Sequence, residues 1–124
     1  MSVIGLGTDI VEIARVESVN ASSERFAKRI LAISELAIYH QHSQPERYLA
    51  KRWAAKEAAA KALGTGIGRG ISFHDFITSN NELGAPKLEL AGKALELANT
   101  MLVTSVLLSI SDEKNYAVAT VILS

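Results

Sequence analysis

An alanine-rich segment at residues 46–63 constrains the fold of this chain more than any other feature. Alanine is dense from residue 50 to residue 62, and alanine has the highest intrinsic helix propensity. Ser43 has capping-box spacing with the first residue of the segment, and Pro45 suits the first helical turn. Gly64 then supplies a C-terminal stop. The sequence therefore predicts one long helix, Glu46–Leu63.

Short apolar segments predict strands on both sides of this helix. These strands are Val3–Val11, Ser72–Thr78, Pro86–Leu90, Ser105–Ser111 and Tyr116–Leu123, the last two an antiparallel pair. Shorter helices are predicted at Arg15–Asn20, at Glu24–Leu31 capped by Ser22 or Ser23, at Ser34–Tyr39 capped by Ser34, and at Gly92–Met101. The fold class is α+β in one domain, residues 1–124, with a mainly antiparallel sheet packed on the long helix plus short helices.

Charge and composition exclude several classes of protein. The 13 basic and 13 acidic residues give a formal net charge of zero, which argues against nucleic acid as the main partner. There is no cysteine, hence no disulfide framework and no thiolate metal site. The chain shows neither a signal-peptide pattern nor an apolar stretch of the roughly 20 residues that cross a bilayer. We expect a cytoplasmic protein with no membrane partner.

The segment Gly5–Glu12 is the first candidate for chemistry. Asp9 stands among apolar residues at the end of a predicted strand, and two glycines allow another chain or a ligand to approach closely. A carboxylate in this position suits a hard cation, which prefers oxygen ligands. The alternative is a strand that ends in a turn with a solvated or capping Asp9.

The segment Trp53–Lys61 on the long helix is the second candidate. Glu57 and Lys61 are four residues apart and share a helix face with Trp53, and the alanines between them leave room beside the helix. Such a face could hold a metal-bound diphosphate, with Lys61 as a point charge on a phosphate oxygen. The alternative is an exposed ion pair that stabilises the helix by about 0.2–0.5 kcal/mol.

The glycine-rich segment Gly64–Arg69 follows a helix instead of preceding one. It is therefore neither a P-loop nor a dinucleotide-binding turn, since both place phosphate at a helix N-terminus. Its backbone amides could still wrap around a ligand, or the segment could be a simple helix end and turn.

Taken together, these segments resemble the holo-acyl-carrier-protein synthase family of 4'-phosphopantetheinyl transferases. Residues 5–11 look like the first motif of the family, and residues 53–61 look like its second. The spacing between the motifs also fits, as do the flanking segments Gly64–Ile67, Gly84–Pro86 and Tyr116–Ala119. The resemblance covers essentially the whole chain.

This resemblance implies a reaction. The family moves 4'-phosphopantetheine from coenzyme A to a serine of apo-acyl carrier protein in support of fatty acid biosynthesis, and adenosine 3',5'-bisphosphate leaves. Asp9 and Glu57 would bind Mg²⁺, and Glu57 would remove the serine proton, directly or through a metal-bound water. Lys61 would stabilise negative charge on the phosphates. Asp9, Glu57 and Lys61 are therefore the expected catalytic residues.

The resemblance also implies partners. Members of this branch are homotrimers with coenzyme A between subunits, and Lys61, Gly64, Thr65, Gly84 and Pro86 are expected to bind it here. The acidic carrier protein would dock on basic residues around an apolar contact: Arg15, Arg25, Arg29 and Phe26. The alternative is a solvated helix face whose charge is offset by Glu12, Glu17 and Glu24. Some relatives have a histidine where this chain has Asp112, which we expect to be a turn residue.

Two rival functions use the same residues. A magnesium-dependent phosphohydrolase would employ Asp9 and Glu57 but would need no carrier protein. A non-catalytic module would bind coenzyme A or a carrier protein without transfer. A module that only binds need not keep Asp9, Glu57 and Lys61 together, so their joint presence favours an enzyme.

Overall fold

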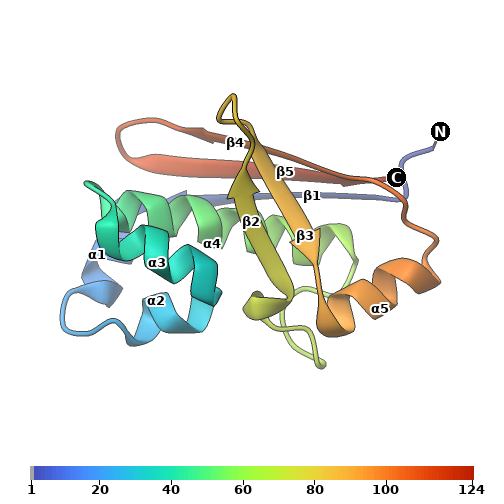
Figure 1. Cartoon of the computed structure of the whole chain (residues 1–124), viewed down its shortest axis with the longest axis horizontal. Coiled ribbons are helices and arrows are strands. Elements are labelled where there is room, and N and C mark those ends of the chain that lie inside the picture. Colours follow the sequence, from blue (N-terminus) through green and yellow to red (C-terminus); the bar gives the residue numbers. More distant parts are fainter. Residues whose placement is uncertain (1) are drawn as a thin grey trace.

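Helix α4 (Pro45–Ala62) runs alongside a three-stranded antiparallel sheet and packs on two of its strands (Figure 1). The sheet has the order β1-β5-β4, with β1 at Gly5–Glu12, β5 at Tyr116–Leu123 and β4 at Val106–Asp112. The structure is a computed structural model and describes residues 2–124. The predicted long helix and the predicted pairing of the last two strands are confirmed.

Small residues bring α4 unusually close to β1. A Cβ atom added at Gly7 would lie 1.9 Å from the Ala58 carbonyl oxygen, and one added at Gly5 would lie 2.1 Å from the Ala62 carbonyl oxygen. The helix backbone therefore occupies the space that side chains would fill on β1. Of the two predicted alternatives, the glycines therefore admit another segment of chain and not a ligand. The prediction that the alanines leave room beside the helix is wrong. Ala58 and its neighbours Ala59 and Ala60 are buried in the core.

Buried and half-exposed residues alternate along β5, and this alternation shows which face of the sheet is turned toward the core. Ala117, Ala119, Val121 and Leu123 are buried, while the residues between them are half-exposed. A period of two is the pattern of a strand with one covered face. Because α4 packs on β1 and β5, this covered face is the one toward the helix. The opposite face carries no element of the described chain.

A second, two-stranded sheet lies across α4 and reaches β4 (Figure 1). It consists of β2 (Phe76–Asn80) and β3 (Pro86–Leu90). The shorter helices gather at the two ends of α4: α1 (Ile13–Asn20), α2 (Arg25–Ile30) and α3 (Ile33–Gln41) at one end, and α5 (Gly92–Thr100) at the other. The α+β class with antiparallel sheets is therefore confirmed.

Several predicted boundaries differ from the structure. The predicted strand Ser72–Thr78 begins with a 3₁₀ turn at Phe73–Asp75, because the Ser72 hydroxyl accepts a hydrogen bond from the His74 amide at 3.2 Å. None of the helices in the described residues is both long and apolar enough to span a membrane.

The predicted N-caps also differ. Gln44 precedes α4 without a side-chain cap, so the predicted capping box on Ser43 is wrong. Helix α3 is preceded by Ala32 instead of Ser34, and the Glu35 carboxylate accepts from the Ala32 amide. At α2 the N-cap is Glu24, although the Ser23 hydroxyl still accepts from the Arg25 amide at 3.3 Å.

We predict that Gly7→Ala destabilises the fold severely. The new methyl group would meet a backbone carbonyl, so α4 must shift as a unit, at a cost at or above the upper end of the about 1–3 kcal/mol of overpacking. Gly64→Ala is the matched control, because its Cβ has open space and only its φ of +84° is unfavourable. The control should cost about 1–2 kcal/mol. Equal losses in urea denaturation would contradict the close-packing account.

Candidate functional site

A surface pocket of about 280 Å³ opens between β1, α1 and α4. Its lining consists of Asp9, Ile10, Val11, Arg15, Trp53 and Glu57. Asp9 lies two residues beyond Gly7, so both point toward α4. Glu57 directly precedes Ala58, whose carbonyl sits over Gly7. The close contact of helix and strand thus brings the two carboxylates to one place.

Lys61 adds a positive charge to this site. Its Nζ donates hydrogen bonds to Asp9 Oδ1 at 2.9 Å and to the Thr8 carbonyl oxygen at 3.0 Å. Lys61 therefore pairs with Asp9 on the strand. It does not form the exposed ion pair with Glu57 along the helix that was the alternative prediction. Asp9, Glu57 and Lys61 come together as the sequence analysis expected. Their catalytic roles stay predictions.

The pKa of Glu57 is raised by burial and by the neighbouring carboxylate of Asp9. Burial raises the pKa of this carboxyl above its ordinary value, and the negative charge of Asp9 raises it further. Lys61 opposes that effect without cancelling it. Asp9 and Glu57 are therefore close enough to interact, with the positive charges of Lys61 and Arg15 beside them.

The donor set fits a hard cation bound jointly with a phosphorylated ligand. The described residues contain no group of three or more His, Cys, Asp or Glu side chains that could hold a metal by themselves. Magnesium commonly takes one or two carboxylates and completes its shell with water and phosphate oxygens. Asp9 and Glu57 supply that number of protein ligands.

Trp53 connects this pocket to the predicted docking residues. The Arg15 guanidinium lies 5.6 Å from the centre of the Trp53 ring, and the Phe26 ring meets Trp53 edge-on at 5.0 Å. Arg25, Phe26 and Arg29 line a neighbouring hollow of about 240 Å³. Arg15 therefore lies in the carboxylate pocket, and the other three docking candidates lie beside it.

The residues predicted to bind coenzyme A fall into two groups. Lys61, Gly64 and Thr65 lie at the C-terminal end of α4. Gly84 and Pro86 lie at the turn of the β2–β3 hairpin, where the Gly84 carbonyl accepts from Asn80 Nδ2 at 2.9 Å. The carboxylate pocket is lined only by residues of β1, α1 and α4. A single chain therefore does not gather both groups around that pocket.

Sequence reasoning missed a basic pocket beside this hairpin. The pocket has a volume of about 410 Å³, and its lining includes Arg47, Lys51 and Arg52. Arg52 is only 6% exposed and donates to Asn80 Oδ1 at 2.9 Å, but its Nε and Nη1 atoms lack a partner in the described structure. The four-residue spacing of Arg47 and Lys51 on one helix was the available indication.

Asp112 lies in the same basic pocket. It is the last residue of β4 and accepts a hydrogen bond from Arg47 at 2.9 Å, with the Lys51 ammonium 3.5 Å away. Burial raises the pKa of Asp112, but the hydrogen bonds and charges of Arg47 and Lys51 outweigh it and hold the pKa below its ordinary value. The expectation of a simple turn residue is wrong, because two cations hold the side chain.

Comparison with known proteins shows the family to which this chain is similar. The sequence model of the 4'-phosphopantetheinyl transferase superfamily matches residues 5–121. A holo-[acyl-carrier-protein] synthase of Photobacterium profundum is 63% identical over 99% of this chain and 98% of its own length. The crystal structure of the holo-[acyl-carrier-protein] synthase from Neisseria meningitidis is 40% identical, with a TM-score of 0.91 and 99% of each chain covered.

The Helicobacter pylori holo-[acyl-carrier-protein] synthase, solved in complex with coenzyme A, is 34% identical. Its TM-score is 0.83, and the match covers 96% of this chain and 99% of that one. This chain therefore belongs to the 4'-phosphopantetheinyl transferase superfamily and, within it, to the holo-[acyl-carrier-protein] synthase family.

We predict that Asp9→Asn lowers the pKa of Glu57. The substitution removes the neighbouring negative charge, while burial of Glu57 remains, so the pKa moves toward its ordinary value without reaching it. Carbon-detected NMR titration of the side-chain carboxyls in the metal-free protein measures the change. Asp112→Asn in the separate basic pocket is the control and should leave Glu57 unaffected. An unchanged Glu57 in Asp9→Asn would show that the two carboxylates do not interact.

Proposed function

We propose that this chain transfers 4'-phosphopantetheine from coenzyme A to a serine of apo-acyl carrier protein, as a single transferase domain over residues 1–124. The family of this chain and the activity for which its relatives are named support this proposal. The observation that carries it is one pocket that holds Asp9, Glu57 and the Arg15–Trp53 contact, with Lys61 bonded to Asp9. The groups proposed to bind phosphate therefore lie next to the predicted docking surface.

Asp9 and Glu57 hold Mg²⁺ in this proposal. Their number suits magnesium shared with a diphosphate, and the negative charge of Asp9 contributes to the raised pKa of Glu57, as expected for two carboxylates that lie close together. The bound cation supplies the positive charge that polarises the phosphorus and neutralises the leaving group.

The chain's own residues then guide the reaction. Glu57 accepts the proton of the serine hydroxyl, directly or through water, as the serine oxygen attacks the β-phosphate. The new bond joins the serine oxygen to phosphorus, and the bond that breaks releases adenosine 3',5'-bisphosphate. The Lys61 ammonium lies close enough to Asp9 to stabilise charge on phosphates held there.

The uncovered face of the three-stranded sheet supports a homotrimer. Leu6, Ile10 and Leu107 expose 64%, 62% and 59% of their surface on this face. An apolar face of this kind on a small chain is typical of an interface. Ile10 also lines the carboxylate pocket, so the pocket opens beside the apolar face. Coenzyme A would extend from this pocket to the Gly84–Pro86 turn and the basic pocket of a neighbouring subunit.

The carrier protein would dock on α1 and α2. Arg25 and Arg29 present positive charge beside Phe26, and Arg15 reaches into the carboxylate pocket. Positive charge on this surface steers an acidic partner toward the site. The cytoplasmic location expected from the sequence stays a prediction.

We predict that Glu57→Gln abolishes transfer while the protein stays folded. Loss of a general base lowers rates by about 10²–10⁴-fold, and loss of a metal ligand adds to this. Intact-mass analysis of apo-acyl carrier protein, after incubation with coenzyme A and Mg²⁺, measures the gain of one phosphopantetheine. Glu46→Gln, in the first turn of the same helix, is the matched control and should keep full activity.

The same assay separates the rival functions. Addition of a chelator should stop the gain in mass. Coenzyme A consumed without a gain would identify a phosphohydrolase, and coenzyme A bound but intact would identify a binding module. Either result with the unaltered chain would overturn the proposed transferase.

We predict that Leu107→Glu dissociates the trimer. The new carboxylate would place a charge on the apolar sheet face that the proposed interface buries, where burial without a partner is unfavourable. Sedimentation velocity measures the oligomeric state. Ile33→Glu is the matched control, since Ile33 is 91% exposed on α3, away from the sheet. A trimer that survives Leu107→Glu, or an unaltered chain that is monomeric, would contradict the proposed interface.

A further inference from the structure

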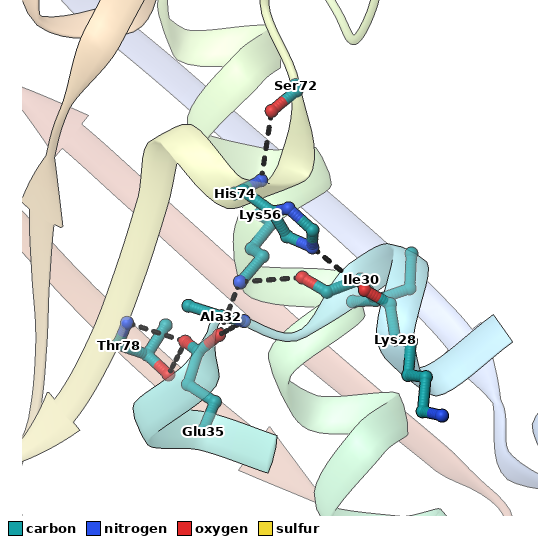
Figure 2. Close-up of polar contacts among 8 residues, drawn as sticks. All are labelled: Lys28, Ile30, Ala32, Glu35, Lys56, Ser72, His74 and Thr78. Atoms are coloured by element: carbon teal, nitrogen blue, oxygen red, sulfur yellow. Dashed lines mark hydrogen bonds and ion pairs between the residues drawn. The ribbon is translucent and has the colours of Figure 1, made fainter. Parts of the chain in front are cut away.

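Lys56, which directly precedes Glu57 on α4, forms a fully buried ion pair with Glu35. Figure 2 shows this pair and its hydrogen bonds. Both Lys56 and Glu35 have no exposed surface. Lys56 Nζ donates to Glu35 Oε1 at 2.5 Å and to the Ile30 carbonyl oxygen at 2.8 Å. The lysine therefore connects α4 to the end of α2 and to α3.

Glu35 is itself held on two sides. Its Oε1 atom also accepts from the Ala32 amide at 2.7 Å. Its Oε2 atom accepts from the Thr78 amide at 2.7 Å and from the Thr78 hydroxyl at 2.6 Å. The hydrogen bonds fix the carboxylate between α3 and β2 (Figure 2). The position of the lysine ammonium is thereby fixed as well.

The stability that a buried ion pair contributes does not by itself explain why this pair is present. The cost of removing two charges from water commonly offsets their attraction, and apolar residues of similar volume often stabilise a protein equally well. A hydrogen bond to one particular carbonyl is different, because it sets a distance and a direction. The contact between Lys56 and Ile30 is of that kind.

The helix held by this contact carries the predicted docking surface. Helix α2 has only six residues, too few to be stable without tertiary contacts. Two side chains of α4, one turn apart, hold its two ends: Trp53 packs against Phe26, and Lys56 bonds to the last residue, Ile30. A further contact, from His74 Nε2 to the Lys28 carbonyl at 2.8 Å, is exposed to solvent.

We propose that Lys56 is a positioning residue for carrier-protein recognition. Its bond to the Ile30 carbonyl holds α2 at a set distance from Glu57, so that Arg25, Phe26 and Arg29 deliver the acceptor serine to the pocket. Glu35 allows the ammonium to be buried at this point. The inference rests on the proposed function, because it concerns recognition of the carrier protein by the same site.

Lys56→Met tests the inference, with Thr78→Val as the matched control. Methionine keeps much of the apolar stem but removes the donor to Ile30. Valine removes one donor to the same buried Glu35 on the β2 side and leaves the Lys56–Ile30 bond intact. Both variants should melt at lower temperature than the unaltered chain. The two variants should differ in steady-state kinetics only if Lys56 has a positioning role.

The expected result is a selective change in KM. Lys56→Met should raise KM for the carrier protein about 10- to 100-fold, since a misplacement of about 1 Å has effects of this size. KM for coenzyme A should stay within about twofold, because the α2 contact is independent of that site. Thr78→Val should change neither KM value by more than about twofold. Unchanged KM values in Lys56→Met, or equal increases for both substrates, would overturn the proposal.

A second measurement does not depend on catalysis. Amide hydrogen exchange of residues 25–30 should be faster in Lys56→Met than in Thr78→Val, while exchange in β1 and β5 stays the same. Unchanged exchange in α2 would also overturn the proposal. If the unaltered chain shows no transfer, the proposed function fails, and exchange still decides whether Lys56 holds α2. Should Lys56→Met fail to fold, Lys56→Met/Glu35→Gln, which leaves no unpaired charge, replaces it with the same expected results.

Discussion

The contact between the backbone of α4 and strand β1 determines where everything else in this molecule lies. Gly5 and Gly7 are two residues apart on β1 and face Ala62 and Ala58, one turn apart on α4. Two strand residues span about 6.6–6.8 Å and four helical residues about 6 Å, so the two repeats match. Asp9 follows Gly7 by two more residues on β1, and Glu57 directly precedes Ala58 on α4. Two carboxylates are held together by rigid elements and not by loops.

The motif on α4 divides its residues between two sides of the helix. Trp53, Glu57 and Lys61 are spaced by four and face the pocket or its rim. Lys56 points the opposite way, into the core, where its charge is matched by Glu35. One helix therefore carries both the predicted chemistry and the attachment of the neighbouring helix α2. Substitutions on the buried side can alter the site through geometry without contacting a ligand.

In a single chain, the two groups of residues that are predicted to bind coenzyme A lie apart. The carboxylate pocket opens beside an uncovered apolar sheet face, and the Gly84–Pro86 turn with its basic pocket lies on a different part of the surface. Symmetric association of small chains commonly joins such separate parts of one site. Burial and the charge of Asp9 raise the pKa of Glu57 in the first of these places, and Arg52 has two nitrogens without a hydrogen-bond partner in the second.

The sequence by itself determined the long helix, the antiparallel pairing of the last two strands and the grouping of Asp9, Glu57 and Lys61. These follow from alanine propensity, alternation and motif resemblance, which are local properties. The predicted N-caps at Ser43 and Ser34 were wrong: α4 begins after Gln44 without a side-chain cap, and at α3 the Glu35 carboxylate accepts from the Ala32 amide, a local contact that the search for a serine cap overlooked. Only the tertiary structure decided that Gly7 receives a helix instead of a ligand, that Asp112 pairs with Arg47, and that Lys56 is buried. The physical reason is that burial and charge pairing depend on residues far apart in the chain, which no local pattern records.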